Sequence, residues 1–393
     1  MPWKTQEVMD LRMEFVRRAI QPGANFRALC REMGISAKTG YKWRDRFLAL
    51  GKMGLRDASR RPIRSPLQLP ESVVCELVRL KRAHQSWGPE KVRELYRRQH
   101  GTPPSLSSCK RVLTKAGLVE PRRIRPRKEA GRVVSPIVAQ EPNDLWTVDF
   151  KGWWRTRNGQ RFEPLTVRDA YSRYILCAQA MSNNTTAMVR TQFERLFEEN
   201  GLPRTIRSDN GTPFAASNAL LGLSRLSAWW LALGIDLDRI RPGHPEENGA
   251  HERMHRDIRH EIQALISGDI VQQQIALDLW RECFNQERPH QALGMKTPSE
   301  LYRRSNRSYT GTPDEIAYEP PLFSRTVNHC GFVKIHGNHL FLSESLCGWQ
   351  VGMKADGPDF LEVNFAHLRL GRIDLTTASF LPVPSHRQER GSS

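Results

Sequence analysis

Residues 145–152 read LWTVDFKG, an apolar and β-rich stretch that contains one acidic side chain, Asp149. A carboxylate in a buried strand is unfavourable unless it binds a partner that compensates its lost hydration. A divalent metal ion is the natural partner for such a group. The stretch therefore predicts a β-strand that carries a functional acid, and it predicts that other acids converge on the same place.

Two further acids stand where the chain turns. Residues 205–211 read TIRSDNG, a short strand pattern that runs into an Asn-Gly turn and places Asp209 at the carboxyl end of the strand. Residues 243–249 read GHPEENG, a loop rich in helix breakers, and the helical pattern that follows carries Glu252 and continues through Leu265. Glu246 and Glu247, within the loop, are rival candidates for the third acid.

Asp149, Asp209 and Glu252 together predict a site for two divalent metal ions. Two such ions about 4 Å apart need several carboxylate oxygens from different elements, and they stabilise both the attacking and the leaving oxygen of a phosphate displacement. Each acid alone is more simply explained as a solvated surface carboxylate. Three acids in these contexts favour the metal site.

Composition limits the class of protein. The 393 residues are 39% hydrophobic, enough for two to four globular domains. No run approaches the roughly 20 apolar residues of a membrane span, and the first residues lack the apolar core of a signal peptide, so we expect a cytoplasmic protein with no membrane partner. The seven cysteines are neither closely paired nor grouped with histidines at zinc-finger spacing, so we expect reduced thiols and no structural zinc.

The net charge of +18 is confined to one part of the chain. Residues 1–140 hold 31 Lys and Arg against 12 Asp and Glu, a net of +19, whereas residues 141–393 hold 29 against 30, a net of −1. A basic excess can serve solubility alone. Its confinement to one segment instead favours a polyanionic partner, and we expect double-stranded DNA.

The first 60 residues predict a helix-turn-helix domain. Helical patterns over 6–20 and 25–33 are followed by a short Gly-containing turn and a third helix, with Ser36 as its N-cap and an apolar side made of Trp43, Phe47 and Leu50. In such a domain the last helix enters the major groove. We expect Lys38, Tyr41 and Lys42 at bases, and Arg44 and Arg46 nearer to the DNA backbone. A plain three-helix bundle with a charged face is the alternative.

A second helical DNA-binding domain is predicted over 67–120, from helical patterns over 71–83, 88–98 and 105–116. Its last helix carries Lys110 and Arg111, which we expect at DNA. The segment 121–140 contains prolines and like charges and cannot form a packed core, so it predicts an extended basic linker. Its residues Arg122, Arg123 and Arg125 either lie along a phosphate backbone or are simply solvated.

Strand and helix patterns alternate over 141–305 and predict one mixed sheet flanked by helices. The strand patterns cover 145–154, 161–168, 174–180, 204–208 and about 235–240, and the helical ones cover 185–199 and about 218–233, 246–266 and 271–286. Residues 320–380 contain short alternating strands separated by Gly, Pro and Asp, which predict a small SH3-like β-barrel. The expected fold class is multidomain α+β.

Four stretches make the chain resemble the integrase-core transposases of bacterial insertion sequences, relatives of retroviral integrases with a ribonuclease-H-like α/β catalytic core. They are WTVDF at 146–150, SDNGTPF at 208–214, HPEENGAHER at 244–253, and FNQERPHQAL at 284–293 with TPSE at 297–300. The resemblance implies that Asp149, Asp209 and Glu252 are a catalytic Asp-Asp-Glu (DDE) triad that binds Mg²⁺ or Mn²⁺. It also implies that the triad drives DNA strand cleavage and joining.

Two departures from that family stand out. The gap between Asp209 and Glu252 is longer than the family commonly has, and the extra length within 215–232 predicts an added surface helix. The zinc module that begins viral integrases has no counterpart here. Around the third acid, we expect Asn248, Arg253 and Arg256 to contact DNA.

The predicted function is transposition, with metal-dependent cleavage at the 3′ ends of a mobile element and transfer of those ends into target DNA. Because two ends must be joined and each chain has one candidate metal site, we expect a homo-oligomer on DNA, associated with the nucleoid. A metal-dependent nuclease that does not join strands and a DNA-binding regulator with an inert core are the rival hypotheses. Inverted terminal repeats around the coding region would favour transposition over both.

Overall fold

The computed structural model describes residues 8–57, 68–119, 137–216, 219–241, 244–265, 267–313 and 315–383, without the side chains of residues 245 and 246. The chain divides into two compact units, Met1–Leu69 and Pro70–Ser393. Arg122, Arg123 and Arg125 of the predicted basic linker lie outside the described residues. No helix in the described ranges is long and apolar enough to cross a membrane.

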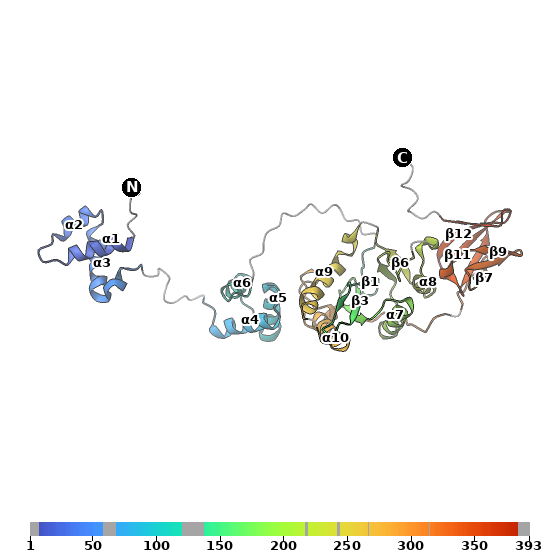
Figure 1. The fold of residues 1–393 in the computed structure, drawn as a ribbon, viewed down its shortest axis with the longest axis horizontal. Helices are drawn as coiled ribbons and strands as arrows, with labels where there is room; N and C mark the ends of the chain where they lie inside the picture. The colour runs from blue at the N-terminus through green and yellow to red at the C-terminus, as the bar shows by residue number, and fades with distance from the viewer. Residues whose placement is uncertain are drawn as a thin grey trace, which may run out of the picture. The chain divides into compact units, whose positions relative to one another are not determined.

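The first unit is a three-helix domain (Figure 1). It consists of α1 (Val8–Ala19), α2 (Phe26–Glu32) and α3 (Ala37–Leu50), followed by a 3₁₀ turn, η1 (Gly51–Leu55). Ser36 caps α3 as predicted, since its hydroxyl accepts the Thr39 N–H at 3.2 Å. Trp43 is buried, but the prediction that Leu50 faces the core is wrong, because Leu50 is 64% exposed and η1 brings Leu55 into the core instead.

The second unit begins with the predicted helical bundle, made of α4 (Glu71–Ala83), α5 (Pro89–His100) and α6 (Leu106–Lys115). Pro89 starts α5, where its fixed φ suits the first turn. Ser105 caps α6 by accepting the Ser108 N–H at 3.2 Å. Leu77, Val92 and Leu113 meet in the apolar centre of the bundle. These bounds confirm the three predicted helices.

A mixed sheet follows, as the alternating pattern predicted. Its strands are β1 (Leu145–Phe150), β2 (Trp154–Arg155), β3 (Arg161–Asp169), β4 (Ile175–Met181), β5 (Thr205–Ser208) and β6 (Asp236–Arg239). The main order is β4-β3-β1-β5-β6, with the short β2 also paired to β3. β3 is antiparallel to β1 and β4, whereas β5 is parallel to β1 and β6.

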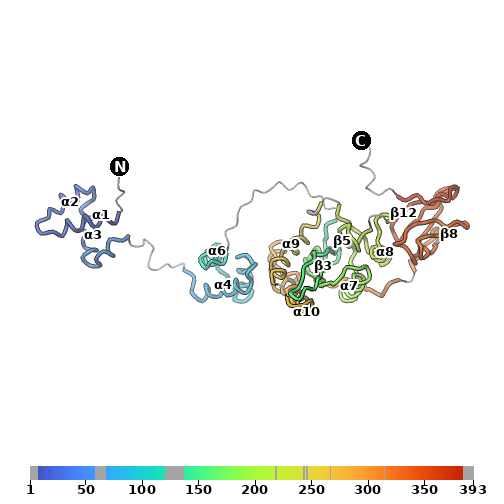
Figure 2. The backbone as a smooth tube through the Cα atoms, viewed as in Figure 1, coloured from blue at the N-terminus to red at the C-terminus, as the bar shows by residue number. Residues whose placement is uncertain are grey.

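Helices cover both faces of this sheet (Figure 2). On one face, α7 (Thr186–Asn200) and α8 (Arg225–Ala232) pack over Trp146 and Val148 of β1. On the other face, α9 (Gly249–Ile258) and α10 (Ile270–Gln286) pack over Ile175, Ala178 and Ala180 of β4. Short helical turns connect these elements at Leu220–Gly222, Pro245–Asn248, Arg259–Gln263 (a π-helical turn), Gln291–Leu293 and Pro298–Glu300.

The segment expected to form an added surface helix is instead internal. In α8, Trp229 and Trp230 join the apolar cluster of the sheet, and Ala228 and Leu231 join the cluster of the C-terminal domain. All of these side chains are at most 2% exposed. A helix that is apolar all round is buried all round, so the prediction of a surface helix is wrong.

The C-terminal domain is an antiparallel sheet with order β13-β12-β11-β10-β7 and a separate hairpin of β8 and β9. The strands are β7 (Phe323–Thr326), β8 (Phe332–Ile335), β9 (Asn338–Phe341), β10 (Gln350–Ala355), β11 (Phe360–Phe365), β12 (Leu368–Asp374) and β13 (Ser379–Pro382), with a 3₁₀ turn at Glu344–Leu346. Within the described residues, β13 and β7 remain edges of the five-stranded sheet. The closed SH3-like barrel is therefore not confirmed.

Candidate active site

The sheet brings the first two predicted acids together. β1 and β5 are parallel neighbours in a register that pairs Leu145 with Thr205 and Thr147 with Arg207. The same register, continued by two residues, puts Asp149 beside Asp209, which follows directly after β5. Glu252 lies in the first turn of α9, on the exposed side of that helix.

The electrostatics of Asp149 report this convergence. Burial raises the pKa of Asp149 to about 7, and the negative charge of Asp209 is the next largest cause. Glu252 and Glu163 raise this pKa further, whereas the backbone N–H of Phe150 opposes the shift. Carboxylates that repel one another in a half-buried site are the donor set that hard divalent cations need. The residues therefore fit a metal site, and Glu163 of β3 is an acid that the sequence reasoning missed.

The rival third acids are placed differently. Glu247 is buried, and its carboxylate accepts hydrogen bonds from the backbone N–H of Arg241 at 2.9 Å and from the guanidinium of the same residue. Both oxygens of this carboxylate therefore already accept hydrogen bonds within the loop. The side chain of Glu246 lies outside the described residues. Glu252 remains the candidate that projects from a helix next to Asp149.

The loop after β5 holds the Asp209 carboxylate. Oδ1 of Asp209 accepts the Gly211 N–H at 3.1 Å, and the Asn210 side chain donates to the Ile240 carbonyl at 2.6 Å. A Cβ atom at Gly211 would lie 3.0 Å from Oδ2 of Asp209. A larger residue at this position would crowd the carboxylate, which gives the Asn-Gly motif a reason in the site.

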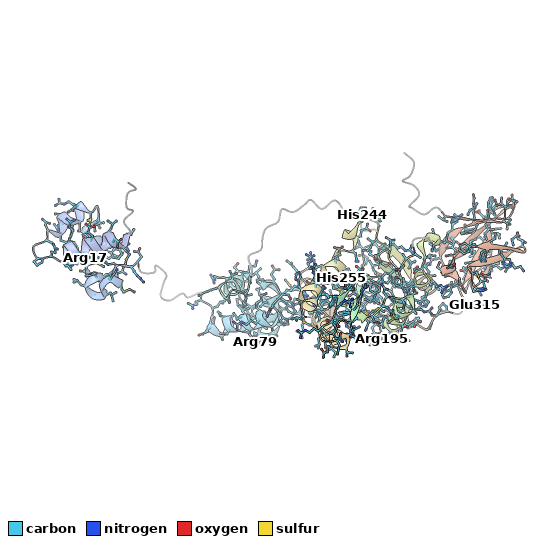
Figure 3. The ribbon with its side chains drawn as sticks, in the orientation of Figure 1. Arg17, Arg79, Arg195, His244, His255 and Glu315 are labelled. Atoms are coloured by element: carbon cyan, nitrogen blue, oxygen red, sulfur yellow. The ribbon has the colours of Figure 1, made fainter. Side chains whose placement is uncertain are left out.

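A buried network of hydroxyl and imidazole groups fastens α9 to the strand of Asp149. His251 and His255 lie one turn apart on α9, and Figure 3 labels His255. The Nε2 atoms of both lie close to Oγ1 of Thr166, at 2.8 and 2.7 Å. Thr166, on β3, donates to the backbone carbonyl of Asp149 at 2.9 Å. Nδ1 of His251 lies 2.8 Å from the hydroxyl of Thr147 on β1. Because His251 directly precedes Glu252 on α9, these hydrogen bonds also hold Glu252 in place.

This network fixes the tautomer of His255. The Thr166 hydroxyl gives its one hydrogen to the Asp149 carbonyl, so both imidazoles must donate to its oxygen. Nδ1 of His255 then carries no hydrogen, and its lone pair is free. This atom lies 3.9 Å from Oδ2 of Asp149. Burial, with Lys151 and Arg168 nearby, lowers the pKa of His255 to about 3 and keeps it neutral. His255 can therefore add a nitrogen ligand beside Asp149, whereas both nitrogens of His251 are already engaged.

Further contacts hold the two ends of α9. The buried Arg168 donates to the carbonyl of Ala250 at 2.7 Å. Arg288 pairs with Asp257 at 2.9 Å and with Glu261 at 3.2 Å. Arg288 belongs to the FNQERPHQAL stretch, so this part of the resemblance has a structural role in supporting the helix of the third acid.

The side chains predicted to bind DNA from α3 lie on its surface. Lys38, Tyr41 and Lys42 are exposed, and Tyr41 stacks on Phe26 with ring centroids 4.2 Å apart. The two arginines expected nearer to the DNA backbone have partners within the domain. Arg44 pairs with Asp45 at 2.8 Å, and Arg46 donates to the Arg56 carbonyl at 3.0 Å.

The other side chains predicted at DNA divide into two groups. Lys110 and Arg111 on α6, and Arg253 and Arg256 on α9, are exposed. Asn248 is only 6% exposed at the start of α9. For all of these residues, DNA contact stays a prediction.

Sequence reasoning missed several residues beside the triad. His251 and His255 stand at i and i+4 around Glu252, a spacing that indicates one helix face and could have been noticed. Lys151 follows Asp149 by two residues, and the pKa of its ammonium is lowered by burial and by Arg259, with Asp149 opposing. No signal in the sequence points to Thr166, because its role depends on strand register.

Parts of the chain are similar to known protein families. Residues 139–245 match one family described as an integrase core domain, and residues 233–298 match another with the same description. Residues 39–113 match a homeodomain-like domain, and residues 11–63 match a helix-turn-helix domain. Residues 139–298 therefore match integrase-core families, and they follow residues that match helix-turn-helix and homeodomain-like domains. This organisation is consistent with an insertion-sequence transposase whose core is integrase-like.

Proteins similar to this chain include two insertion-element proteins. It is 27% identical over 272 residues to the insertion element IS476 uncharacterized 39.2 kDa protein of Xanthomonas euvesicatoria, covering 68% of this chain and 74% of that protein. It is 26% identical over 235 residues to the insertion element IS407 uncharacterized 31.7 kDa protein of Burkholderia multivorans, covering 59% of this chain and 80% of that protein. The HTLV-2 integrase catalytic core domain in complex with magnesium (trimeric form) aligns with a TM-score of 0.33 at 15% identity, covering 42% of this chain and 100% of that one.

Proposed function

We propose that this protein is a DDE transposase that binds the ends of a mobile DNA element, cleaves their 3′ ends and transfers them into target DNA. The observation that carries the proposal is the strand register that sets Asp149 beside Asp209, with α9 placing Glu252 close enough for the charges of both acids to raise the pKa of Asp149. Such repulsion between acids is expected in a site that binds divalent cations. Basic helical domains that precede this site suit a DNA substrate.

Asp149, Asp209 and Glu252 would hold two Mg²⁺ or Mn²⁺ ions, and Nδ1 of His255 is available as a further ligand beside Asp149. When bound, such ions lower the pKa of a coordinated water or hydroxyl and stabilise the charge on the phosphate oxygens. The protein's own contribution is to hold the ligands still. Thr166 and His251 serve this purpose by joining α9 to the strands of the sheet.

Both proposed reactions are in-line displacements at phosphorus. In cleavage, a water oxygen forms a bond to phosphorus, the bond from phosphorus to the 3′ oxygen breaks, and the 3′ oxygen receives a proton while water loses one. In strand transfer, the freed 3′ hydroxyl attacks a target phosphate, and the target 3′ oxygen leaves and is protonated. No covalent intermediate with the protein is needed.

Single substitutions Asp149→Ala, Asp209→Ala and Glu252→Ala test the triad. We expect each to abolish cleavage and joining of a labelled element end in Mg²⁺ or Mn²⁺ while DNA binding persists, because the basic domains supply the affinity. Asp278→Ala, at an exposed acid on α10 that pairs with Arg281 at 3.7 Å, is the matched control and should remain active. Full activity in any triad variant would remove that residue from the proposed site.

The same assay separates the rival functions. A nuclease that does not join strands would release cleaved ends but would form no product covalently linked to target DNA. A regulator with an inert core would bind the ends and yield neither product. Joined product that depends on all three acids supports the transposase.

A further inference from the structure

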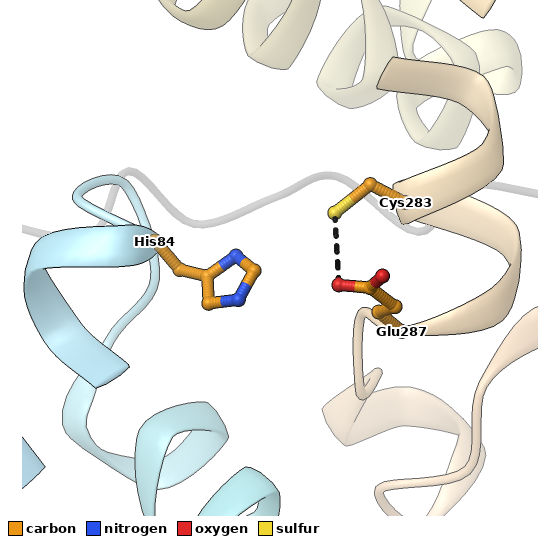
Figure 4. A group of neighbouring side chains, drawn as sticks. All are labelled: His84, Cys283 and Glu287. Carbon is orange, nitrogen blue, oxygen red and sulfur yellow. Dashed lines mark hydrogen bonds between the residues drawn. The ribbon is translucent and has the colours of Figure 1, made fainter. Parts of the chain in front are cut away.

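A second group of potential metal ligands lies away from the triad, where the helical bundle meets the integrase core. His84 follows α4, and Cys283 and Glu287 stand one turn apart at the end of α10 (Figure 4). One ligand atom from each of the three residues lies within 4.8 Å of the other two. Sγ of Cys283 is 3.8 Å from Oε2 of Glu287.

His84 is held in position with its nitrogens unused. Its ring stacks on the buried Trp87, with centroids 3.9 Å apart and an interplanar angle of 15°. The carbonyl of Trp87 accepts from the ammonium of Lys81 at 2.8 Å, which steadies the turn between α4 and α5. Among the described residues, neither nitrogen of the half-buried His84 ring has a hydrogen-bond partner, and Figure 4 shows the ring facing Cys283 and Glu287.

Cys283 is one of the residues that connect the helical bundle with the core. It projects from α10 of the core and packs against the apolar cluster that contains Leu77, Val92 and Leu113 of the bundle. Other polar contacts across this boundary come from Arg98, which pairs with Glu300 at 3.0 Å and donates to the Met295 carbonyl at 2.9 Å. A partly exposed ion pair of this kind adds little stability by itself.

We propose that His84, Cys283 and Glu287 bind a Zn²⁺ ion that fastens the helical bundle to the integrase core. A thiolate, an imidazole and a carboxylate are a zinc donor set, and three protein ligands leave a fourth tetrahedral position for water. Binding replaces the proton of the Cys283 thiol by the metal. This site is separate from the triad, and it does not depend on the proposed transposase function.

The charges around the group favour a cation. Burial raises the pKa of the Cys283 thiol to about 11, and the negative charges of Glu287 and Glu261 act in the same direction. Burial lowers the pKa of His84, and the negative charges of Glu287 and Glu261 oppose this shift. The surroundings that disfavour a bare thiolate would be relieved by a divalent ion that binds it.

Cobalt substitution in the full-length protein tests the site. After removal of bound metal with a chelator, titration with CoCl₂ should give a thiolate-to-cobalt charge-transfer band, and ZnCl₂ should abolish it by displacing cobalt. Carboxylate ligands of the triad cannot give such a band. The band should persist in Asp149→Ala, which separates failure of this site from failure of the proposed function.

Four variants assign the ligands. Cys283→Ser should lose the band, and Cys75→Ser, at an exposed cysteine on α4, should keep it. His84→Gln and Glu287→Gln should weaken cobalt binding on the order of tenfold or more, and they preserve the packing of Cys283 if Cys283→Ser folds poorly. Absence of the band in the unmodified protein, or its persistence at full strength in Cys283→Ser or His84→Gln, would overturn the proposal.

Discussion

At the scale of single residues, the Asp149 carboxyl group has opposing requirements. It stands in a strand whose neighbours Trp146 and Val148 are fully buried, yet it must be charged to bind a cation. In the metal-free protein the conflict is resolved by a proton, because the pKa of Asp149 is raised to about 7. A bound divalent ion would take the place of that proton.

Metal binding should therefore depend on pH. Between about pH 4 and pH 7 the folded metal-free protein holds a proton on Asp149 that the unfolded chain has lost, so its stability falls as pH rises through this window. Below pH 7 a cation must displace that proton. We expect Mn²⁺ or Mg²⁺ to raise the melting temperature more at pH 8 than at pH 6.

Asp149→Asn is the matched variant for this measurement. It should remove most of the cation-induced shift, and it should raise the melting temperature of the metal-free protein at pH 8, because the buried charge is gone. Equal cation-induced shifts at the two pH values would contradict the role assigned to the Asp149 proton.

Thr166 gives a second prediction at this scale. Thr166→Val removes the hydroxyl that accepts from His251 and His255 and leaves two buried N–H groups unpaired, a loss of roughly 1–3 kcal/mol each when no water replaces it. We expect weaker Mn²⁺ binding and at least tenfold slower cleavage with unchanged DNA affinity, since 1.4 kcal/mol corresponds to a factor of ten.

Thr166→Ser provides the control because it keeps the hydroxyl, and it should restore most of the metal affinity. A general packing defect would instead leave the serine variant as impaired as the valine variant. Normal metal affinity in Thr166→Val would show that α9 is positioned without this network.

The sequence pointed to the candidate acids but not to the residues that contact them. Asp149 and Asp209 could be singled out because a charge in a strand and an Asn-Gly turn are local patterns. The contacts of Thr166 arise from the pairing of β1 with β3 and the packing of α9, which no local pattern encodes. The zinc ligands proposed above were missed for the same reason, since His84 and Cys283 are far apart in the sequence.

At the scale of elements, capping residues and hydropathy patterns differ in how well they predict the helices and strands. The cap Ser36 correctly predicted where α3 begins. The strands β7 and β13 are short edge strands with weak alternation, so their bounds are hard to predict from a local pattern. In α8, the run LSAWWLA is apolar on every side, which indicates a buried helix. We expected a surface helix there because the segment contains the extra length between the second and third acids.

The third helix of the first unit carries a prediction about recognition. Lys38→Ala and Lys42→Ala should each weaken binding to the element's end DNA by about 1–3 kcal/mol and reduce its preference over random DNA, if these side chains contact bases. Loss of affinity for both DNAs alike, with a smaller dependence on salt, would place the lysines at phosphates instead.

Arg18→Ala is a suitable control for these lysines. Arg18 lies on α1 and forms two hydrogen bonds of 2.7 Å to Glu32, so its charge is already paired within the domain. The variant should bind end DNA nearly as well as the unmodified protein. Binding defects that equal those of the lysine variants would indicate a general charge effect rather than recognition by α3.

At the scale of the whole molecule, the three candidate acids and the first helical domain lie in different compact units. The acids lie in Pro70–Ser393, and the first helical domain forms a unit of its own, Met1–Leu69. The C-terminal sheet is joined to the core through Ala228 and Leu231 of α8, so it belongs structurally with the part that carries the acids. Under the proposed function, this division would allow one chain to recognise an end while another performs the reaction on it.

Complementation between defective chains tests that arrangement. Coordinated joining requires two 3′ hydroxyls at one target, and each chain has one triad, so we propose that the working form contains at least two chains. Full-length Asp149→Ala chains lack the proposed chemistry, and chains of residues 70–393 lack the first recognition unit. We expect each alone to be inactive and their mixture to recover part of the joining activity. As a control, the mixture should recover no joining activity if the chain of residues 70–393 also carries Asp149→Ala. No recovery in any mixture, together with a monomeric mass on paired-end DNA, would refute the shared arrangement.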